Sequence, residues 1–383
     1  MKDSQFAESP LNSIRVFFGG MDDPRVDRTK KHDLLEVLVV TLCAVICGAD
    51  SCVDVEIFGK ARLDLFRTFL ELPNGIPSHD TIGRILAALD PDELAKGFAA
   101  WVAWLCEDLA GEIIPIDGKT LRRSYDRAKG KSSVHLVSAW ASQTGLSLGQ
   151  VAVDDKSNEI TAIPRLLKIL NIRGATITLD AMGCQTQIAE QIIQQEGDYV
   201  LAVKGNQEKL YEEVKRVMEE VRQPINEAHV GYFESTEKGH GRIETRKVWS
   251  TDRVDWMHEK DRWTGLAGVT LVESQRTIGQ VTSTEHRYYI TSHKGTNAGY
   301  MAHAIRSHWA IENTQHWTLD MVFNEDGSRI RMQNADQNMA LFRKMALNLI
   351  KQEKSTKASV NSKRNRAAWE INYLFTVLAA KPI

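Results

Sequence analysis

An acid closes the apolar run Ile113-Ile114-Pro115-Ile116-Asp117-Gly118-Lys119. A second acid closes the similar run Ala175-Thr176-Ile177-Thr178-Leu179-Asp180-Ala181. Short runs that are rich in β-branched residues are typical of buried strands. Packing explains the strands but not an acid at the end of each one. The sequence therefore predicts two neighbouring parallel strands that carry Asp117 and Asp180 to the same place.

A third acid, Glu312, lies in the segment His308-Trp309-Ala310-Ile311-Glu312-Asn313-Thr314-Gln315-His316-Trp317. We expect this segment to be helical and to bring Glu312 to the other two acids. Asp320 is a rival for the third position, because it follows eight residues later, near the same helical face. Carboxylates that converge make the oxygen-rich site that Mg²⁺ or Mn²⁺ prefers, and two such ions can promote an in-line displacement at phosphorus. The acids therefore indicate an enzyme that acts on the phosphodiesters of nucleic acid.

The residues around the first two acids predict a mixed sheet with helices on both faces. Along this stretch the periodicity gives strand, strand, strand, helix, strand, helix, strand, which is the element order of a ribonuclease H-like domain. The predicted strands are 113–117, 134–141, 146–153, 175–179 and 198–203, and the predicted helices are 160–170 and 187–195. The fold class is thus α/β.

The flanking regions divide the chain into three predicted domains. Residues 1–110 predict an all-helical N-terminal domain, with helices at 33–47, 53–72, 78–89 and from 90 onward. Residues 111–332 predict the catalytic domain, with a charged helix at 207–222, a β-rich insertion at about 228–292 and a helix at 297–317. Residues 333–383 predict C-terminal helices at 333–352 and 366–379.

The N-terminal helices suit either the binding of DNA ends or a purely structural bundle. The helix that Ser78-His79-Asp80-Thr81 opens carries Arg84. Base contacts usually come from a helix in the major groove, so this helix is the candidate for reading DNA. The alternative is that it only packs against the core.

The bulk composition is that of an ordinary globular protein. The 383 residues are 43% hydrophobic and 26% charged. A formal net charge of -2 does not exclude a nucleic-acid enzyme, because local basic patches matter more than the total. The five cysteines match no zinc-binding spacing and are expected to be reduced thiols. We see no secretory signal, and the most apolar run, 34–47, is too short to span a membrane, so a cytoplasmic protein is expected.

Several motifs point together to one family. They include Ile116-Asp117-Gly118-Lys119-Thr120-Leu121-Arg122 and Lys156-Ser157-Asn158-Glu159-Ile160-Thr161-Ala162-Ile163-Pro164, followed by 178–185, 202–207, 240–242, 287–290 and 308–313. With these motifs the chain resembles, over nearly its whole length, the DDE transposases of bacterial insertion sequences, specifically the H-repeat-associated (ISAs-type) family. It departs from related transposases around the third acid, where their Tyr, Arg and Lys positions hold Ile305, His308 and Leu319.

The resemblance implies a ribonuclease H-like core with Asp117, Asp180 and Glu312 as catalytic acids and metal ligands. It implies Mg²⁺ or Mn²⁺ as the cofactor, with two ions when DNA is bound. The implied partner is double-stranded DNA, both element ends and target, with a homodimer in the active complex and no membrane. The implied location is the bacterial cytoplasm, at the nucleoid when the protein acts.

Basic and polar residues near the acids are candidates for binding DNA. Lys119, Arg122 and Arg123 follow the first acid, where they could neutralise phosphates, or could be solvated loop cations. The other candidates, each of which could be structural instead, are Lys204 and Asn206 after the fifth strand, His240 and Arg242 in the insertion, and His308. His308 and His316 lie eight residues apart and could position a nucleophile, or could be hydrogen-bonded structural histidines.

The leading functional hypothesis is metal-dependent transposition. Water first cuts a phosphodiester at the element end, and the freed 3′-hydroxyl then attacks target DNA. Neither step needs a covalent enzyme intermediate, so no Ser or Tyr nucleophile is predicted. The alternatives are a hydrolytic nuclease of the same fold and a catalytically silent DNA-binding remnant of a mobile element. The intact acids Asp117, Asp180 and Glu312 argue against the remnant.

Overall fold

The computed structural model describes residues 11–106, 108–154, 157–222, 229–239 and 241–379. Within these residues one mixed sheet has the strand order β3-β2-β1-β4-β5-β9-β8-β7-β6. Its strands are β1 Ile113–Thr120, β2 His135–Ala141, β3 Leu146–Ala152, β4 Thr176–Leu179, β5 Asp198–Val203, β6 Val230–Gly239, β7 Arg242–Thr251, β8 Gly268–Ile278 and β9 Val281–Thr291. β1, β4 and β5 run parallel, whereas the other neighbouring pairs are antiparallel.

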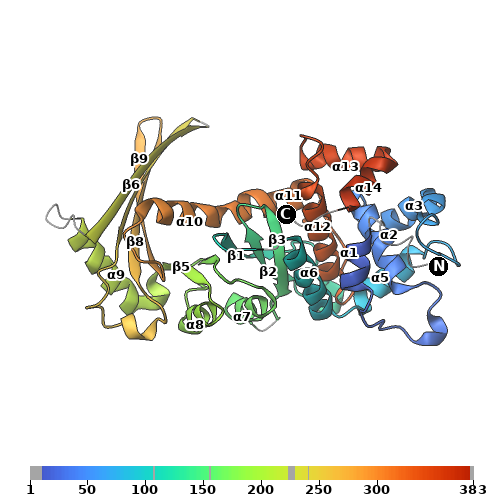
Figure 1. Ribbon diagram of the computed structural model, residues 1–383, viewed down its shortest axis with the longest axis horizontal. Helices are drawn as coiled ribbons and strands as arrows, with labels where there is room; N and C mark the ends of the chain where they lie inside the picture. Colours follow the sequence, from blue (N-terminus) through green and yellow to red (C-terminus); the bar gives the residue numbers. More distant parts are fainter. Residues whose placement is uncertain (1–10, 107, 155–156, 223–228, 240, 380–383) are drawn as a thin grey trace.

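Helices cover both faces of the sheet around β1 and β4. α7 (Glu159–Ile169) and α8 (Thr186–Gln194) lie on one side, and α10 (Ala298–Ala310) crosses the other (Figure 1). Because helices cover both faces, every residue of β4 is buried, as expected for a central parallel strand. This explains why its sequence is apolar and β-branched without alternation.

The helices at the two ends of the chain form one body with the sheet. The N-terminal helices are α1 Asn12–Phe18, α2 Leu34–Ile46, α3 Cys52–Ala61, α4 Leu63–Phe66, α5 His79–Ala88 and α6 Pro91–Leu105, and the C-terminal ones are α12 Ala335–Gln352, α13 Val360–Trp369 and α14 Ile371–Leu378. α12 packs against α2, α5, α6 and β3, and each of its residues from 338 to 350 is buried. A single hydrophobic cluster therefore runs from Leu11 to Leu378.

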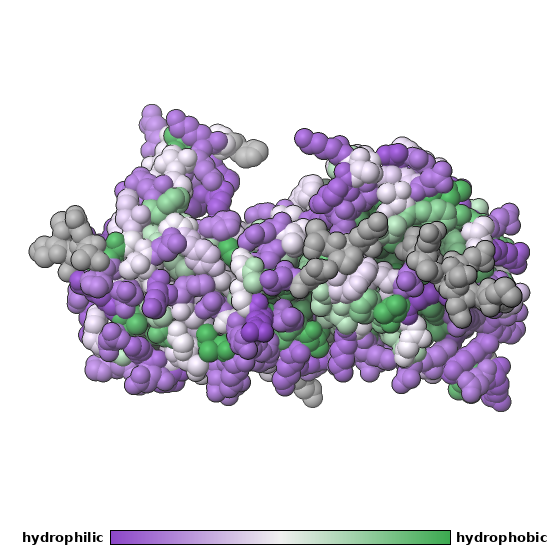
Figure 2. All heavy atoms as spheres, in the orientation of Figure 1, coloured by the Kyte–Doolittle hydropathy of each residue, from purple (hydrophilic) through white to green (hydrophobic). Residues whose placement is uncertain are grey.

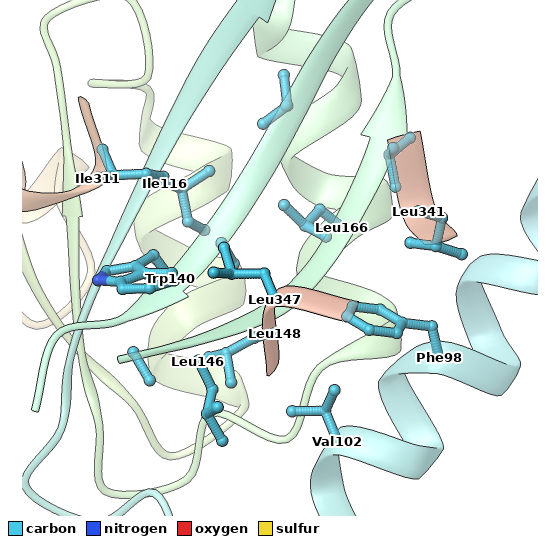
Figure 3. Close-up of a cluster of buried hydrophobic side chains, with 14 of the residues drawn as sticks. Phe98, Val102, Ile116, Trp140, Leu146, Leu148, Leu166, Ile311, Leu341 and Leu347 are labelled. Atoms are coloured by element: carbon cyan, nitrogen blue, oxygen red, sulfur yellow. The ribbon is translucent and has the colours of Figure 1, made fainter. Parts of the chain in front are cut away.

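Figure 3 shows the centre of this cluster. Phe98 and Val102 of α6, Trp140 of β2, Leu166 of α7 and Leu347 of α12 meet there. Ile116 and Ile311, each directly before a predicted catalytic acid, point into the same cluster (Figure 3). Burying a side chain of this kind stabilises the fold by roughly 1.5–3 kcal/mol. Packing thus fixes the backbone on which two of the acids sit.

Two predicted helices are each broken in two. The segment 53–72 was expected to be one helix, but α3 and α4 are separated at Arg62, whose φ of -120° and ψ of 21° leave the helical range. The segment 366–379 is interrupted at Glu370, where φ is -118° and ψ is 108°. The apolar periodicity continues across both breaks, so the pattern alone could not show them.

The β-rich insertion extends the same sheet instead of forming a separate one. After α9 (Glu208–Val221), strands β6 to β9 form an arm at one end of the molecule (Figure 1). β9 returns to pair with β5, with Leu201 opposite Ile290. Figure 2 shows a mostly hydrophilic surface whose upper outline is hollowed between this arm and the C-terminal helices.

The remaining short helices lie in the connections. They are η1 Asp27–Thr29, η2 Arg127–Lys129, η3 Gly205–Gln207, η5 Lys260–Arg262, the π-helix η6 Ile311–His316 and α11 Trp317–Met321. None of the helices in the described part of the chain combines the length and the apolar character needed to cross a membrane.

Candidate active site

Asp117 lies on β1 with its carboxylate mostly shielded from solvent, at 19% side-chain exposure. Burial raises its pKa to about 7, and the charges of Glu312, Glu159 and Asp180 add to this rise. The backbone N–H of Gly118 acts in the opposite direction. Two of these three contributing charges belong to the other predicted acids.

Asp180 follows β4 at the same level of the sheet as Asp117. Pro115 pairs with Thr178 in the parallel β1–β4 ladder, and each acid lies two residues beyond its paired residue. Neighbouring strands are about 4.8 Å apart. Asp180 Oδ1 accepts hydrogen bonds from the backbone N–H groups of Met182 at 2.9 Å and Gly183 at 3.1 Å. The turn after β4 thus fixes this carboxylate at the sheet edge.

A second segment braces that turn. Asn206 Nδ2 donates to the carbonyl oxygen of Ala181 at 2.6 Å, and Gln207 Nε2 donates to that of Cys184 at 3.0 Å. Asn206 was predicted to contact DNA, and the structure gives it this contact within the protein. Lys204, two residues earlier, is exposed, and its charge helps to lower the pKa of Glu285.

Glu312 lies on a π-helical turn. α10 ends at Ala310, Ile311–His316 forms the wider turn, and α11 continues from Trp317. Glu312, Asn313 and Thr314 are exposed on it, whereas Ile311 is buried. π-turns inside α-helices occur frequently at functional sites. The sequence predicted a continuous helix here, because no residue pattern signals the extra residue of a π-turn.

Two histidines, His308 (half-buried) and His316 (buried), lie close to residues of β1 and β4. His308 Nδ1 is 3.0 Å from Thr178 Oγ1, and burial lowers its pKa although the charge of Asp180 opposes this. His316 Nδ1 is 3.8 Å from Asp117 Oδ2. Burial, followed by the charges of Lys344 and Lys119, lowers the pKa of His316 to about 3. Both imidazoles are therefore neutral at physiological pH.

Lys119 makes ion pairs inside the protein. Its Nζ contacts Asp320, the rival third acid, and lies 2.8 Å from Glu325 Oε2. Burial would raise the pKa of Glu325, but the charges of Lys119, Lys344 and Arg343 hold it at about 2. Sequence reasoning did not assign this buried acid a role, because its partner lies 206 residues away.

The other predicted DNA contacts lie near the surface. Arg122 Nε is 3.2 Å from Asp326 Oδ2. Arg123 is exposed, and its carbonyl oxygen accepts a hydrogen bond from Arg331. In the arm, Arg242 Nε is 2.8 Å from Glu244 Oε1. His240 falls outside the described residues.

The acids fit a divalent cation by their chemistry. Carboxylate oxygens are the donors that Mg²⁺ and Mn²⁺ prefer. Burial is the main cause of the raised pKa of Asp117, and a cation would offset the smaller contribution of the neighbouring negative charges. In the described residues, no three Asp, Glu, His or Cys side chains already stand close enough to hold an ion between them.

Comparison with known proteins gives consistent matches over the chain. Residues 109–349 match the family described as "Transposase DDE domain", and residues 16–102 match "DDE_Tnp_1-associated". The chain is 40% identical over 356 residues to "H repeat-associated putative transposase YhhI" of Escherichia coli (strain K12), covering 91% of this chain and 93% of that protein. It is 41% identical over 378 residues to "Putative transposase YncI" of Escherichia coli O157:H7, covering 97% and 95%.

Two further matches are partial or distant. "Inactive transposase YbfQ" of Escherichia coli (strain K12) is 45% identical over 56 residues, which cover 15% of this chain and 67% of that protein. Among solved structures, "Cryo-EM structure of piggyBac transposase synaptic complex with hairpin DNA (SNHP)" superposes with a TM-score of 0.42 at 11% identity, covering 99% and 82%. A score this low says nothing further about this chain. The extent of the domain match, and the identity to relatives along nearly their whole length, show that this protein belongs to the DDE transposase family, as the H repeat-associated relatives do.

Proposed function

We propose that this protein is an insertion-sequence transposase that cuts DNA at element ends and joins the freed ends to target DNA. One observation carries the proposal: in a DDE-family chain, the parallel β1–β4 ladder sets Asp117 and Asp180 at the same level of the sheet, and the charge of Glu312 contributes to the raised pKa of Asp117. Converging acids of this kind suit divalent-metal chemistry on phosphodiesters. The hydrolytic nuclease is the second candidate, since it would use the same acids.

The sheet supports a ribonuclease H-like core. The part of the sheet that carries the acids has the order β3-β2-β1-β4-β5, with β1 antiparallel to β2 and parallel to β4. The sheet is mixed, as the order of predicted elements indicated. On this proposal the helices on both faces hold β1 and β4 rigid, and rigid elements position a catalytic group more accurately than loops do.

When bound, Mg²⁺ or Mn²⁺ would supply Lewis acidity and an activated water or 3′-hydroxyl. Asp117, Asp180 and Glu312 are the residues that would hold the metal. Because the pKa of the Asp117 carboxyl is about 7, its protonated form must lose the proton before the group can bind a cation. The rings of His308, beside Thr178, and of His316, beside Asp117, are neutral and add no positive charge there.

DNA is the proposed partner. Near the acids, Trp309, Trp317 and Met321 are exposed, the last two at 57% and 67%. Large exposed apolar side chains that gather beside a site mark a binding surface, and aromatic rings can stack on bases. Arg287 lies over the ring of Trp309 at 4.8 Å and would face the same DNA. The proposed complex is a homodimer that acts on chromosomal DNA in the cytoplasm.

The test is end-DNA cleavage followed by strand transfer. Duplexes carrying the DNA that flanks the gene are incubated with the protein and Mg²⁺ or Mn²⁺, and pre-cleaved ends are supplied with a target plasmid. We expect metal-dependent nicking and joined products, both lost in Asp180→Asn. Nicking without joining would favour the nuclease. No metal-dependent product with the intact protein would contradict both.

A further inference from the structure

Lys119 links the strand that carries Asp117 to the helix that follows the π-turn. Lys119 lies two residues after Asp117 on β1, so the two side chains lie on the same face of the strand. Its Nζ contacts Asp320 on α11 and lies 2.8 Å from Glu325 Oε2, in the turn after that helix. One ammonium group thus joins β1 both to α11 and to the turn beyond it.

This contact lies on the side of the sheet that faces the π-turn. A Cβ atom on Gly118 would meet Glu159 of α7. Side chains alternate along a strand, so those of Asp117 and Lys119 point to the opposite side. On that side His316 Nδ1 is 3.8 Å from Asp117 Oδ2, and β1 packs against the π-turn. Lys119 therefore makes a further connection between β1 and the segment that carries the third acid.

Burial keeps Lys119 with its two acids. The side chain of Lys119 is 13% exposed and that of Glu325 only 1%. If Lys119 turned outward to bind a phosphate, it would leave a buried carboxylate without the cation that donates a hydrogen bond to it, which is strongly unfavourable. The lysine that the sequence predicted as a DNA contact is thus committed to the protein's own acids.

The position of this link matters for Glu312. Ile311, directly before Glu312, is buried and holds the start of the π-turn in the core. Asp320 follows Glu312 by eight residues, which is roughly two helical turns, and Lys119 ties it to β1. The π-turn that presents Glu312 is thereby held at both ends, and one of the two attachments is to the strand of Asp117 itself.

We infer that Lys119 is a positioning residue, which acts through Asp320 and Glu325 to hold the helical segment of Glu312 in place relative to Asp117. The inference rests on the proposed function and adds to it the device that aligns two of its acids. Catalytic groups have to be held within about 0.5 Å of their productive geometry, and a misplacement of about 1 Å can lower a rate about 100-fold. Loss of the link should therefore reduce the rate of cleavage and leave the affinity for DNA unchanged.

Hydrogen exchange of the full-length protein, without metal or DNA, tests the link directly. Lys119→Met keeps the aliphatic stem and removes the charge, so the amides of 312–321 should exchange roughly 10-fold faster or more, with those of α8 unchanged. The matched control is Lys131→Met, because Lys131 Nζ is 2.5 Å from Asp336 Oδ2, which belongs to another buried acid. It should leave the exchange of 312–321 as in the wild type. Wild-type exchange of 312–321 in Lys119→Met, or a uniform rise along the whole chain, would overturn the inference.

Kinetics of end-DNA cleavage separate positioning from DNA binding. Lys119→Met and Asp320→Asn should each lower kcat about 10–100-fold without a change in KM for DNA. The double variant should be no slower than the slower single variant, because both changes remove the same link.

A contact between Lys119 and a phosphate would give the opposite pattern. Lys119→Met would then raise KM and reduce the slope of log affinity against log salt by about 0.9, whereas Asp320→Asn would leave both unchanged. That pattern, or a wild-type kcat in Lys119→Met, would overturn the inference and leave the proposed function standing. An absence of cleavage by the wild-type protein would remove both.

Discussion

At the scale of single residues, Asp117 makes stability depend on pH. Its carboxyl has a pKa of about 7 in the folded protein, mainly because of burial, against 3.8 as its ordinary value. Between these values the unfolded chain has lost the proton and the folded protein retains it, so stability falls as pH rises from about 4 to about 7. Asp117→Asn should therefore stabilise the metal-free protein by on the order of 3 kcal/mol at pH 8 and by almost nothing at pH 4.

Urea unfolding at the two pH values measures this difference. Asp64→Asn serves as the control, because Asp64 is an exposed acid on α4, and it should leave the stability unchanged at both. An equal effect of Asp117→Asn at pH 4 and pH 8 would mean that the carboxyl is not protonated in the folded state at low pH.

Glu325 has the opposite dependence on pH. Its pKa, held at about 2 by Lys119 and the neighbouring cations against the effect of burial, lies below the ordinary 4.5. Its contribution is therefore complete above about pH 4.5 and is lost as pH falls toward 2. Removing one partner of a buried ion pair costs about 3–5 kcal/mol, so Glu325→Gln should lower the free energy of unfolding by that amount at pH 7.

Chemical denaturation at pH 7 and pH 3 checks this expectation, and the loss should be smaller at pH 3. Glu220→Gln on the exposed face of α9 is the control. A loss below about 1 kcal/mol at pH 7, the size expected for a surface pair, would show that Glu325 is not part of a buried network.

At the scale of elements, the π-turn sets the direction of Glu312. Ile311 on one side and Leu319 on the other are both buried, so the helix is anchored at both ends of the turn. Deleting the exposed Thr314 would restore α-helical spacing and turn α11 by roughly 100° relative to Glu312. We expect DNA cleavage to fall to background while the helical circular dichroism is kept.

The matched variant is Thr314→Ala, which keeps the spacing and should cleave normally. Cleavage by the deletion variant at the wild-type rate would show that the π-turn has no part in placing the acid.

Sequence patterns identify those elements whose environment is uniform. β4 is buried throughout, and its unbroken β-branched and apolar run is enough to predict a buried strand. α6 begins at Pro91 behind the cap Asp90, a local signal that needs no tertiary information. The break at Arg62 and the π-turn carry no such signal.

The partners of Lys119 are 201 and 206 residues away, and which distant acid reaches a lysine depends on how the elements pack.

At the scale of the whole molecule, the end helices and the sheet depend on one another. Lys344 Nζ of α12 donates to Gln150 of β3 at 2.6 Å, and Asn338 Nδ2 donates to the carbonyl oxygen of Leu86 in α5 at 2.8 Å. Removing residues 1–105 would expose the apolar side of α12 and leave such groups unpaired. We expect this truncated protein to be insoluble or unfolded by circular dichroism and gel filtration.

The control is a shorter deletion in the arm, at the opposite end of the molecule from the N-terminal helices. Replacing residues 276–282, the exposed tip of the β8–β9 hairpin, with a short glycine turn should leave a folded protein. A soluble, helical protein after deletion of 1–105 would mean instead that the N-terminal helices are an independent domain.

The place of α12 also has a consequence in time. The helix that fills the centre of the fold begins at Ala335, whereas the strand that carries Asp117 begins at Ile113. Ribosomes add roughly 5–20 residues per second. The synthesis of α12 is therefore completed on the order of 10–40 s after that of β1. A nascent chain therefore cannot close its core until α12 has been synthesised.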